Sequence, residues 1–167
     1  KKNKIDVIMG SGKVLAGKKI QVTGADGTVL EVSGKNIIIA TGGRSRSLPN
    51  MPQDGTKIIG YREAMTLPTQ PKSMVIVGSG AIGVEFAYFY NSLGTKVTIV
   101  EYAPNIVPVE DEEVSKALAK SFKSAGVEIM TNAEVTSVDT SGTGCKVKVK
   151  EAAGEKVLEC DIVLSAV

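Results

Sequence analysis

The order of apolar and polar positions divides the chain into a strand-like part and a part where strands alternate with helices. Up to about residue 40, apolar residues alternate or cluster in short runs, as in KIDVIMG at 4–10 and KKIQVTG at 18–24. Asp26-Gly27 stands between two such runs and indicates a hairpin turn. The run NIIIATGG at 36–43 predicts a buried strand that ends at glycines.

Residues 44–72 have a different composition, in which polar residues are mixed with prolines. This pattern predicts a linker that holds one short strand near Ile58 and a helical turn over 61–67. The prolines are Pro49, Pro52, Pro68 and Pro71.

From Ser73 the rhythm of the sequence changes. MVIVG at 74–78 is apolar throughout, which is typical of a parallel strand covered on both faces. A helix follows and ends at Gly94, and KVTIVE at 96–101 predicts the next strand. Four residues are expected to form the buried face of this helix: Ile82, Phe86, Tyr90 and Leu93.

A second helix is predicted at 109–126, with acidic residues in its first turn, lysines later and Gly126 at its end. Its apolar stripe consists of Val114, Ala117, Leu118 and Phe122. VEIM at 127–130 then predicts a third strand. The remainder is β-rich, with a hairpin over 145–160 and a final strand at 161–167.

These elements define an α/β fold. We expect a Rossmann-like βαβαβ dinucleotide-binding domain with antiparallel β-meander additions, preceded by a β-rich piece of another domain. The expected boundaries are 1–43 for the β-rich piece, 44–72 for the linker and 73–167 for the nucleotide-binding domain. The first residue is Lys1 and the last apolar strand stops at Val167, so we expect a fragment of a longer protein.

Composition narrows the chemistry of the 167 residues. The net charge of +2 gives no reason to expect nucleic acid or a membrane surface as a partner, and no apolar run approaches the roughly 20 residues of a membrane helix. The sequence has no histidine, which removes the commonest general base and metal ligand. Cys145 and Cys160 lack Cys-x-x-Cys spacing, so we expect small buried residues rather than a redox pair or metal site.

Three spaced glycines connect the strand at 74–78 to the helix that follows. Gly78 allows a sharp turn, Gly80 leaves room for a pyrophosphate, and Gly83 lets helix and strand pack closely. The start of a helix also offers free N–H groups to phosphates. The spacing alone is equally compatible with an ordinary tight turn, and the strand–helix context favours the nucleotide site.

A dinucleotide site of this kind has an acid about 20 residues further on, and Glu101 stands at that distance. Its carboxylate can accept hydrogen bonds from both adenosine ribose hydroxyls and would repel a 2′-phosphate. No basic residue follows in EYAPNIV, so NAD is favoured over NADP. Glu85, which we place in the first turn of the helix, is either a helix-start acid or a functional acid near the nicotinamide, and its spacing leaves both readings open.

Three stretches of sequence together resemble a known family. They are NIIIATGGRSRSLPN at 36–50, GSGAIGVEFAYFYNSLGTKVTIVE at 78–101 and PVEDEEVSKALAKSFKSAGVEIMTNAEV at 108–135. In this order they resemble the dihydrolipoamide dehydrogenases, which are flavoprotein disulfide reductases. The resemblance implies an oxidoreductase that reoxidises protein-bound dihydrolipoamide through a redox disulfide and FAD and reduces NAD⁺. It also implies a homodimer that serves the lipoyl carrier domain of a 2-oxoacid dehydrogenase or glycine cleavage complex, in the cytoplasm or an organelle matrix.

The resemblance also assigns roles to residues of this sequence. It implies an NAD site formed by Gly78, Ser79, Gly80, Ala81, Ile82, Gly83, Glu85, Glu101 and Val135. It implies contacts with FAD, in the full-length protein, from Gly12, Thr41, Gly42 and Gly43. Glu85 resembles the acid that pairs with a lysine beside the flavin.

Two features of the family are absent from the sequence, namely the Cys-x-x-x-x-Cys redox pair and the acid–base histidine. The chain therefore resembles the middle of the enzyme and is expected to be inactive alone, with weak or absent FAD binding. The alternatives are an NADH oxidase or other NADH-dependent reductase of this class, or a stand-alone nucleotide-binding module without redox chemistry.

Overall fold

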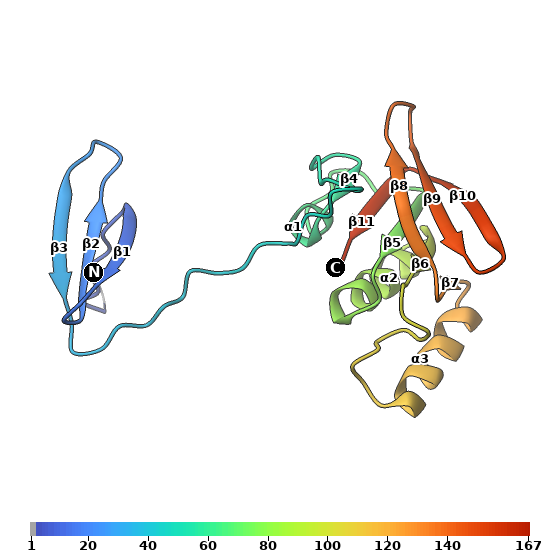
Figure 1. Cartoon of the computed structure of the whole chain (residues 1–167), viewed down its shortest axis with the longest axis horizontal. Coiled ribbons are helices and arrows are strands. Elements are labelled where there is room, and N and C mark those ends of the chain that lie inside the picture. Colours follow the sequence, from blue (N-terminus) through green and yellow to red (C-terminus); the bar gives the residue numbers. More distant parts are fainter. Residues whose placement is uncertain (1–2) are drawn as a thin grey trace. The chain divides into compact units, whose positions relative to one another are not determined.

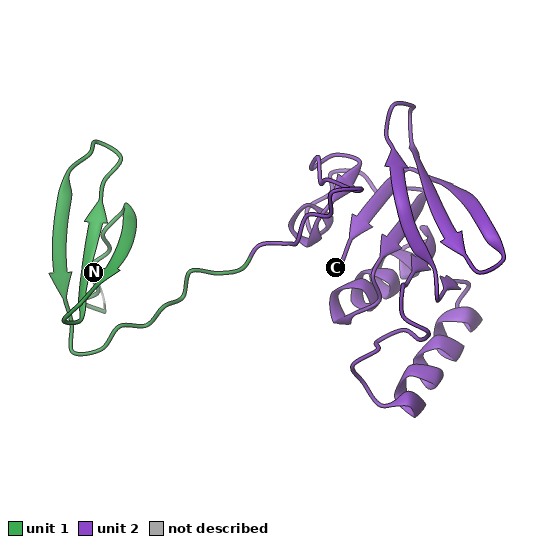
Figure 2. Cartoon of the chain, in the orientation of Figure 1, with its two compact units in different colours: residues 1–43 green, residues 44–167 purple. Residues whose placement is uncertain are grey.

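The computed structural model describes residues 3–167, which fall into two compact units (Figure 2). Unit 1 ends at Gly43, and unit 2 comprises Arg44–Val167. Each unit is described by itself. The segment 44–72, expected to be a linker, lies within unit 2.

Unit 1 is a three-stranded antiparallel sheet in the order β1-β2-β3 (Figure 1). Its strands are β1 Ser11–Leu15, β2 Lys19–Thr23 and β3 Val29–Ser33. The predicted hairpin turn is confirmed, because the Asp26 carboxylate accepts hydrogen bonds from the backbone N–H and hydroxyl of Thr28, at 3.0 and 2.6 Å. Gly27 completes the turn with a φ of 80°, which glycine adopts without strain.

Two strands predicted for this part of the chain are wrong. Residues 4–10 and 36–43 contain no strand, and the Ile38 side chain is 89% exposed. A strand needs a neighbour for its backbone N–H and C=O groups. No segment among the described residues pairs with either run, so their apolar composition does not produce a strand.

Unit 2 is built on a five-stranded parallel sheet in the order β4-β11-β5-β6-β7 (Figure 1). Its strands are β5 Ser73–Val77, β6 Lys96–Val100, β7 Glu128–Met130, β11 Ile162–Ser165 and the short β4 Ile58–Ile59. Helix α2 Ala81–Ser92 connects β5 to β6, and α3 Glu112–Ser124 connects β6 to β7. The predicted βαβαβ arrangement is therefore confirmed, and the last strand enters the sheet between β4 and β5.

An antiparallel sheet covers one face of the parallel sheet. It has the order β10-β9-β8, with β8 Glu134–Asp139, β9 Cys145–Glu151 and β10 Gly154–Cys160. Val75 and Val77 of β5 pack in one core cluster with Val147 and Val149 of β9. The intervening β5 residues pack in a second cluster with residues of the two long helices. Successive side chains of a strand point to opposite faces, so unit 2 has three layers, with the parallel sheet in the middle.

The segment 44–72 does more than connect the two parts of the chain. Met51, Ile58 and Ile59 are buried in unit 2. The expected strand near Ile58 is β4, and the expected helical turn is α1 Tyr61–Ala64. The hydroxyl of Tyr90 in α2 donates to the carbonyl of Ala64 at 2.5 Å, which ties this segment to the helix layer.

The predicted buried faces of both helices need correction. Tyr90 is buried in α2, but Ile82 and Leu93 are 44% and 53% exposed, and the other buried residues are Gly83 and Ala87. The buried face of α2 therefore combines two small residues with Tyr90, and Phe86 packs against it. In α3, Phe122 is buried and Leu118 is partly buried, but Ala117 is exposed and Val114 is 52% exposed, while Ser115 is buried. The predicted glycine ends are confirmed, with positive φ at Gly94 and Gly126.

Candidate functional site

The three glycines of the β5–α2 loop meet different surroundings, which separate their roles. A Cβ at Gly83 would stand 2.1 Å from the carbonyl oxygen of Gly78, so helix and loop touch there. Gly78 has a φ of 96°, and a Cβ on it would stand 2.7 Å from the carbonyl oxygen of Ala166. Gly80 faces open space, with nothing within 4 Å of its Cβ position. The open space lies where a phosphate would approach the loop.

Helix α2 starts at this open space without a side-chain cap. Gly80 is its N-cap residue, and the helix has no acidic residue in its first turn. The first helical hydrogen bond runs from the N–H of Val84 to the carbonyl of Gly80, at 3.1 Å. The N–H groups of residues 81–83 therefore have no partner within the helix and suit a negatively charged ligand. Glu85 was expected in the first turn of the helix, and this placement is wrong.

Glu101 follows β6 and connects the glycine loop to the next loop of the chain. Its side chain is buried, and Oε2 accepts from the backbone N–H and the hydroxyl of Ser79, at 2.7 and 2.6 Å. Oε1 accepts from the backbone N–H of Ala103 at 2.7 Å. A carboxylate offers about four acceptor positions, so three of them serve the protein. The expected double contact with ribose would require Ser79 or Ala103 to release one of these positions.

The loop after Glu101 is held against the glycine loop. The N–H of Val107 donates to the carbonyl of Ser79 at 2.9 Å, and Val107 adopts a φ of 42°. The hydroxyl of the buried Ser115 donates to the carbonyl of Ile106 at 2.6 Å. Asp111 caps α3 by accepting from the N–H of Glu113 at 2.8 Å. These contacts restrain residues 106–111, the segment whose Val107 contacts Ser79.

A cavity of about 660 Å³ lies beside Glu101, where the loops that follow β6 and β7 meet. Ligands of open α/β sheets bind at this end of the strands. Sequence reasoning did not find the residues that line it, because β9 brings some of them from far along the chain. They are Tyr102, Ala103, Pro104, Asn132, Glu134, Lys150, Glu151 and Ala152.

The remaining expected site residues do not join this arrangement by any hydrogen bond. Val135 is buried in the core, and its carbonyl accepts from the Asn50 side chain at 2.6 Å. Glu85 is exposed and borders a cavity of about 420 Å³ with Met65, Phe86 and Phe89. Among the expected site residues of the described chain, side-chain hydrogen bonds therefore connect only the glycine loop and Glu101.

The residues expected to contact FAD are all in unit 1. Gly12 pairs with Val22 in the β1–β2 ladder, and Thr41, Gly42 and Gly43 follow in an exposed segment without regular structure. Five prominent cavities among residues 3–167 are lined by other residues. Their contact with FAD stays a prediction for the full-length protein.

Residues 3–167 hold neither a cluster of metal ligands nor a membrane-spanning helix. No group of three or more histidine, cysteine, aspartate or glutamate side chains is placed to hold a metal ion within this range. The helices of the same range are too short or too polar for any of them to cross a membrane.

The parallel sheet, the glycine loop and the buried acid form the arrangement that is typical of dinucleotide-binding folds. The whole chain, residues 1–167, matches the family described as pyridine nucleotide-disulphide oxidoreductase, and the chain belongs to this family. The predicted fold class and the resemblance to flavoprotein disulfide reductases are thereby confirmed.

Individual relatives of the chain are named more specifically than the family as a whole. The chain is 43% identical over 168 residues to a dihydrolipoyl dehydrogenase from Chlorobaculum tepidum, a match that covers 100% of the chain and 36% of that protein. Among solved structures it is similar to LpdA from Mycobacterium tuberculosis, with a TM-score of 0.83 and 31% identity over 96% of the chain and 36% of LpdA. It is also similar to the flavoprotein disulfide reductase RclA from Escherichia coli, with a TM-score of 0.77 and 31% identity over 96% of the chain and 35% of RclA. The chain spans about a third of the length of the relatives it matches.

Proposed function

We propose that unit 2 binds NAD(H) at the glycine loop. The observation that carries this proposal is the open space at Gly80, which faces the uncapped start of α2 and lies one residue from the serine that holds Glu101. A pyrophosphate at Gly80 would meet the N–H groups of residues 81–83. The adenosine would then lie toward Glu101 and the cavity bordered by Tyr102 and Asn132.

The charges around this cavity support NAD over NADP. A 2′-phosphate would meet the Glu101 carboxylate, and residues 102–110 include no lysine or arginine. Lys150 also lines the cavity, but Glu134 and Glu151 line it with the opposite charge. The lining therefore supplies no net positive charge for a second phosphate.

For the whole protein we propose the activity of a dihydrolipoyl dehydrogenase, in which a dihydrolipoyl group on a carrier domain is reoxidised and NAD⁺ is reduced. The support is 43% and 41% identity to two proteins of that name over nearly all of the chain. When bound, FAD would supply the electron transfer between a redox disulfide and NAD⁺. In this chain the residues of unit 2 bind and orient the dinucleotide, and its 167 residues contain no histidine to move a proton.

The pattern of glycine environments permits a direct test of NAD binding. Gly80→Ala adds a methyl group to open space with an ordinary φ, so the chain should remain folded. The methyl group should block the approach of a phosphate, and the Kd for NADH should rise by about tenfold or more, the equivalent of about one strong hydrogen bond. Isothermal titration with NADH and with NADPH measures both the affinity and the preference for NADH.

Gly142→Ala is the matched control, since Gly142 also faces open space with an ordinary φ and lies outside this loop. It should leave the Kd for NADH unchanged. The proposal fails if the folded chain shows no heat of NADH binding, or if Gly80→Ala binds as tightly as the unaltered chain.

A further inference from the structure

The two cysteines, far apart in sequence, are direct neighbours in the antiparallel sheet. Cys145 is the first residue of β9 and Cys160 is the last residue of β10, and the ladder pairs one with the other. Residues opposite each other in such a ladder have Cα atoms about 4.5–5.5 Å apart. Disulfides bridge Cα separations of this size.

Both side chains lie on the same face of the sheet. Along β9 the buried residues Cys145, Val147 and Val149 alternate with exposed lysines, and Cys160 belongs to the same core cluster. Both cysteines carry free thiols. The expectation of two small buried residues is therefore confirmed, but the wide sequence spacing concealed that they form a pair.

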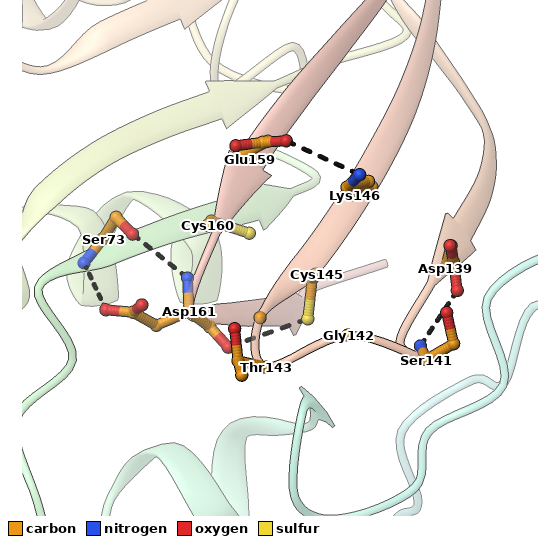
Figure 3. A pocket seen from close by; sticks show the side chains of 11 residues that line it. Ser73, Asp139, Ser141, Gly142, Thr143, Cys145, Lys146, Glu159, Cys160 and Asp161 are labelled. Carbon is orange, nitrogen blue, oxygen red and sulfur yellow. Dashed lines mark hydrogen bonds and ion pairs between the residues drawn. The ribbon is translucent and has the colours of Figure 1, made fainter.

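A cavity of about 580 Å³ borders this pair, whose side chains are buried in the structure (Figure 3). Both cysteines line it, together with the loop that enters β9. That loop contains Gly142, which faces open space, and Gly144, where a Cβ would stand 2.6 Å from the carbonyl oxygen of Cys160. Figure 3 shows the Cys145 sulfur beside Thr143 of this loop and Cys160 on the neighbouring strand.

The surroundings of the two thiols give them different reactivity. A hydrogen bond from Cys160 lowers the pKa of the Cys145 thiol against the opposing effect of burial, and the positive charge of Lys57 lowers it further. The same hydrogen bond, together with burial, raises the pKa of Cys160 far above its usual range. Lys57 is held at this place because its ammonium donates to the carbonyl of Thr140 at 2.7 Å and to that of Gly142. Because the ammonium of Lys57 is held at the loop that enters β9, next to Cys145, we assign Cys145 as the attacking thiol and Cys160 as the resolving thiol.

We propose that Cys145 and Cys160 are a redox-modifiable dithiol that closes to an intramolecular disulfide by exchange with a low-molecular-weight disulfide. The Cys145 thiolate attacks one sulfur of the small disulfide, and the first small thiol leaves. Cys160 then loses its proton and attacks the Cys145 sulfur of the mixed disulfide, and the second small thiol leaves. Two electrons pass from the cysteines to the small disulfide, which takes up two protons and becomes two thiols.

The new bond would join the two ends of the β9–β10 hairpin at its contact with the parallel sheet. Asp161 follows Cys160 directly, and its carboxylate accepts from the N–H groups of Lys72 and Ser73 at 2.7 and 3.1 Å. The Cys145 thiol in turn lies 3.7 Å from the carbonyl of Asp161. Ser73 is the first residue of β5, whereas the glycine loop follows the last residue of that strand. The modification site is therefore separate from the glycine loop, and the inference does not depend on NAD binding.

Incubation of the folded chain with oxidised glutathione tests the proposal. Thiols that remain are alkylated under denaturing conditions, and the digested chain is analysed by mass spectrometry. The expected result is the loss of both thiols in a monomeric chain, with one peptide pair that joins Cys145 to Cys160 and is separated by dithiothreitol. The proposal is overturned if both thiols remain free, if a glutathione adduct persists on the unaltered chain, or if the disulfides join different chains.

Single variants separate the two roles. Cys160→Ser removes the resolving thiol, so Cys145 should retain glutathione as a stable mixed disulfide. Cys145→Ser removes the attacking thiol, so Cys160 should stay free. The reverse pattern would overturn the assignment of roles. If a variant fails to fold, the peptide map of the unaltered chain still decides whether the disulfide forms.

Discussion

At the scale of single residues, Glu101 shows how a buried carboxylate is stabilised without a positive partner. Burial of a charge is costly unless hydrogen bonds replace those made with water. Three neutral donors do so, two from Ser79 and one from the backbone of Ala103. The residue expected to hold the ribose is thus also the residue that positions the glycine loop.

Ser79→Ala should lower the free energy of unfolding by about 1.5–3 kcal/mol, because it removes a hydrogen bond to a buried charge. Urea denaturation followed by circular dichroism measures this change. Ser92→Ala is the control, since Ser92 is exposed at the end of α2 and should shift stability by less than about 0.5 kcal/mol. Equal stability of the two variants would show that Ser79 does not support Glu101.

At the scale of elements, one exposed aspartate organises the turn that leads into β4. Asp54 accepts hydrogen bonds from the backbone N–H groups of Thr56, Lys57 and Ile58, at 2.7, 2.7 and 3.0 Å. Ile58 and Ile59 are buried, so the turn directs both β4 residues into the core. Partial burial raises the pKa of Asp54, but the hydrogen bonds outweigh it and hold the pKa below the ordinary value of 3.8.

This lowered pKa predicts a loss of stability in acid. A carboxylate with a lowered pKa in the folded state contributes its stability above the unfolded pKa, near 3.8, and loses it as the pH falls through the folded value. Asp54→Asn keeps the shape without the charge, so its stability should fall less than that of the unaltered chain between about pH 7 and about pH 3. The difference should be at most about 1 kcal/mol, because exposed charges are screened.

Urea denaturation at both pH values checks this prediction, with Asp6→Asn as the control. Asp6 is exposed and makes no hydrogen bond or ion pair among the described residues. Several other carboxylates also have lowered pKa values, so only the comparison between variants isolates Asp54. The same acid sensitivity in all three chains would contradict the role of its turn.

At the scale of the whole molecule, both hydrophobic core clusters and the glycine loop belong to unit 2. Every residue of the two clusters lies between Leu48 and Val167. The hydrogen bonds that hold Glu101 lie within the same range. A unit with its own hydrophobic core is able to fold by itself.

We therefore expect residues 44–167, produced alone, to fold and to bind NADH with the same Kd as the complete chain. Thermal unfolding by circular dichroism should show one cooperative transition, and isothermal titration gives the Kd. A non-cooperative transition, or a large loss of NADH affinity, would show that unit 1 is required.

The sequence by itself determined the elements whose signals are local. The apolar run of β5, the glycine loop, the helix ends at Gly94 and Gly126, and the β9–β10 hairpin all depend on neighbours within a few residues. Short-range spacing also placed Glu101 at the end of β6. These predictions succeeded because backbone geometry and strand or helix periods are properties of short segments.

Only the tertiary structure decided which segments meet. It left 36–43 without a partner strand, buried Gly83 and Ala87 of α2 in place of Ile82 and Leu93, set Ser79 against Glu101, and brought Cys145 opposite Cys160. Each outcome depends on the pairing or packing of segments distant in the chain, and the apolar pattern of one segment does not specify its partner. The sequence therefore predicted the frame of the nucleotide site, while the tertiary structure determined the contacts of its acid and the cysteine pair.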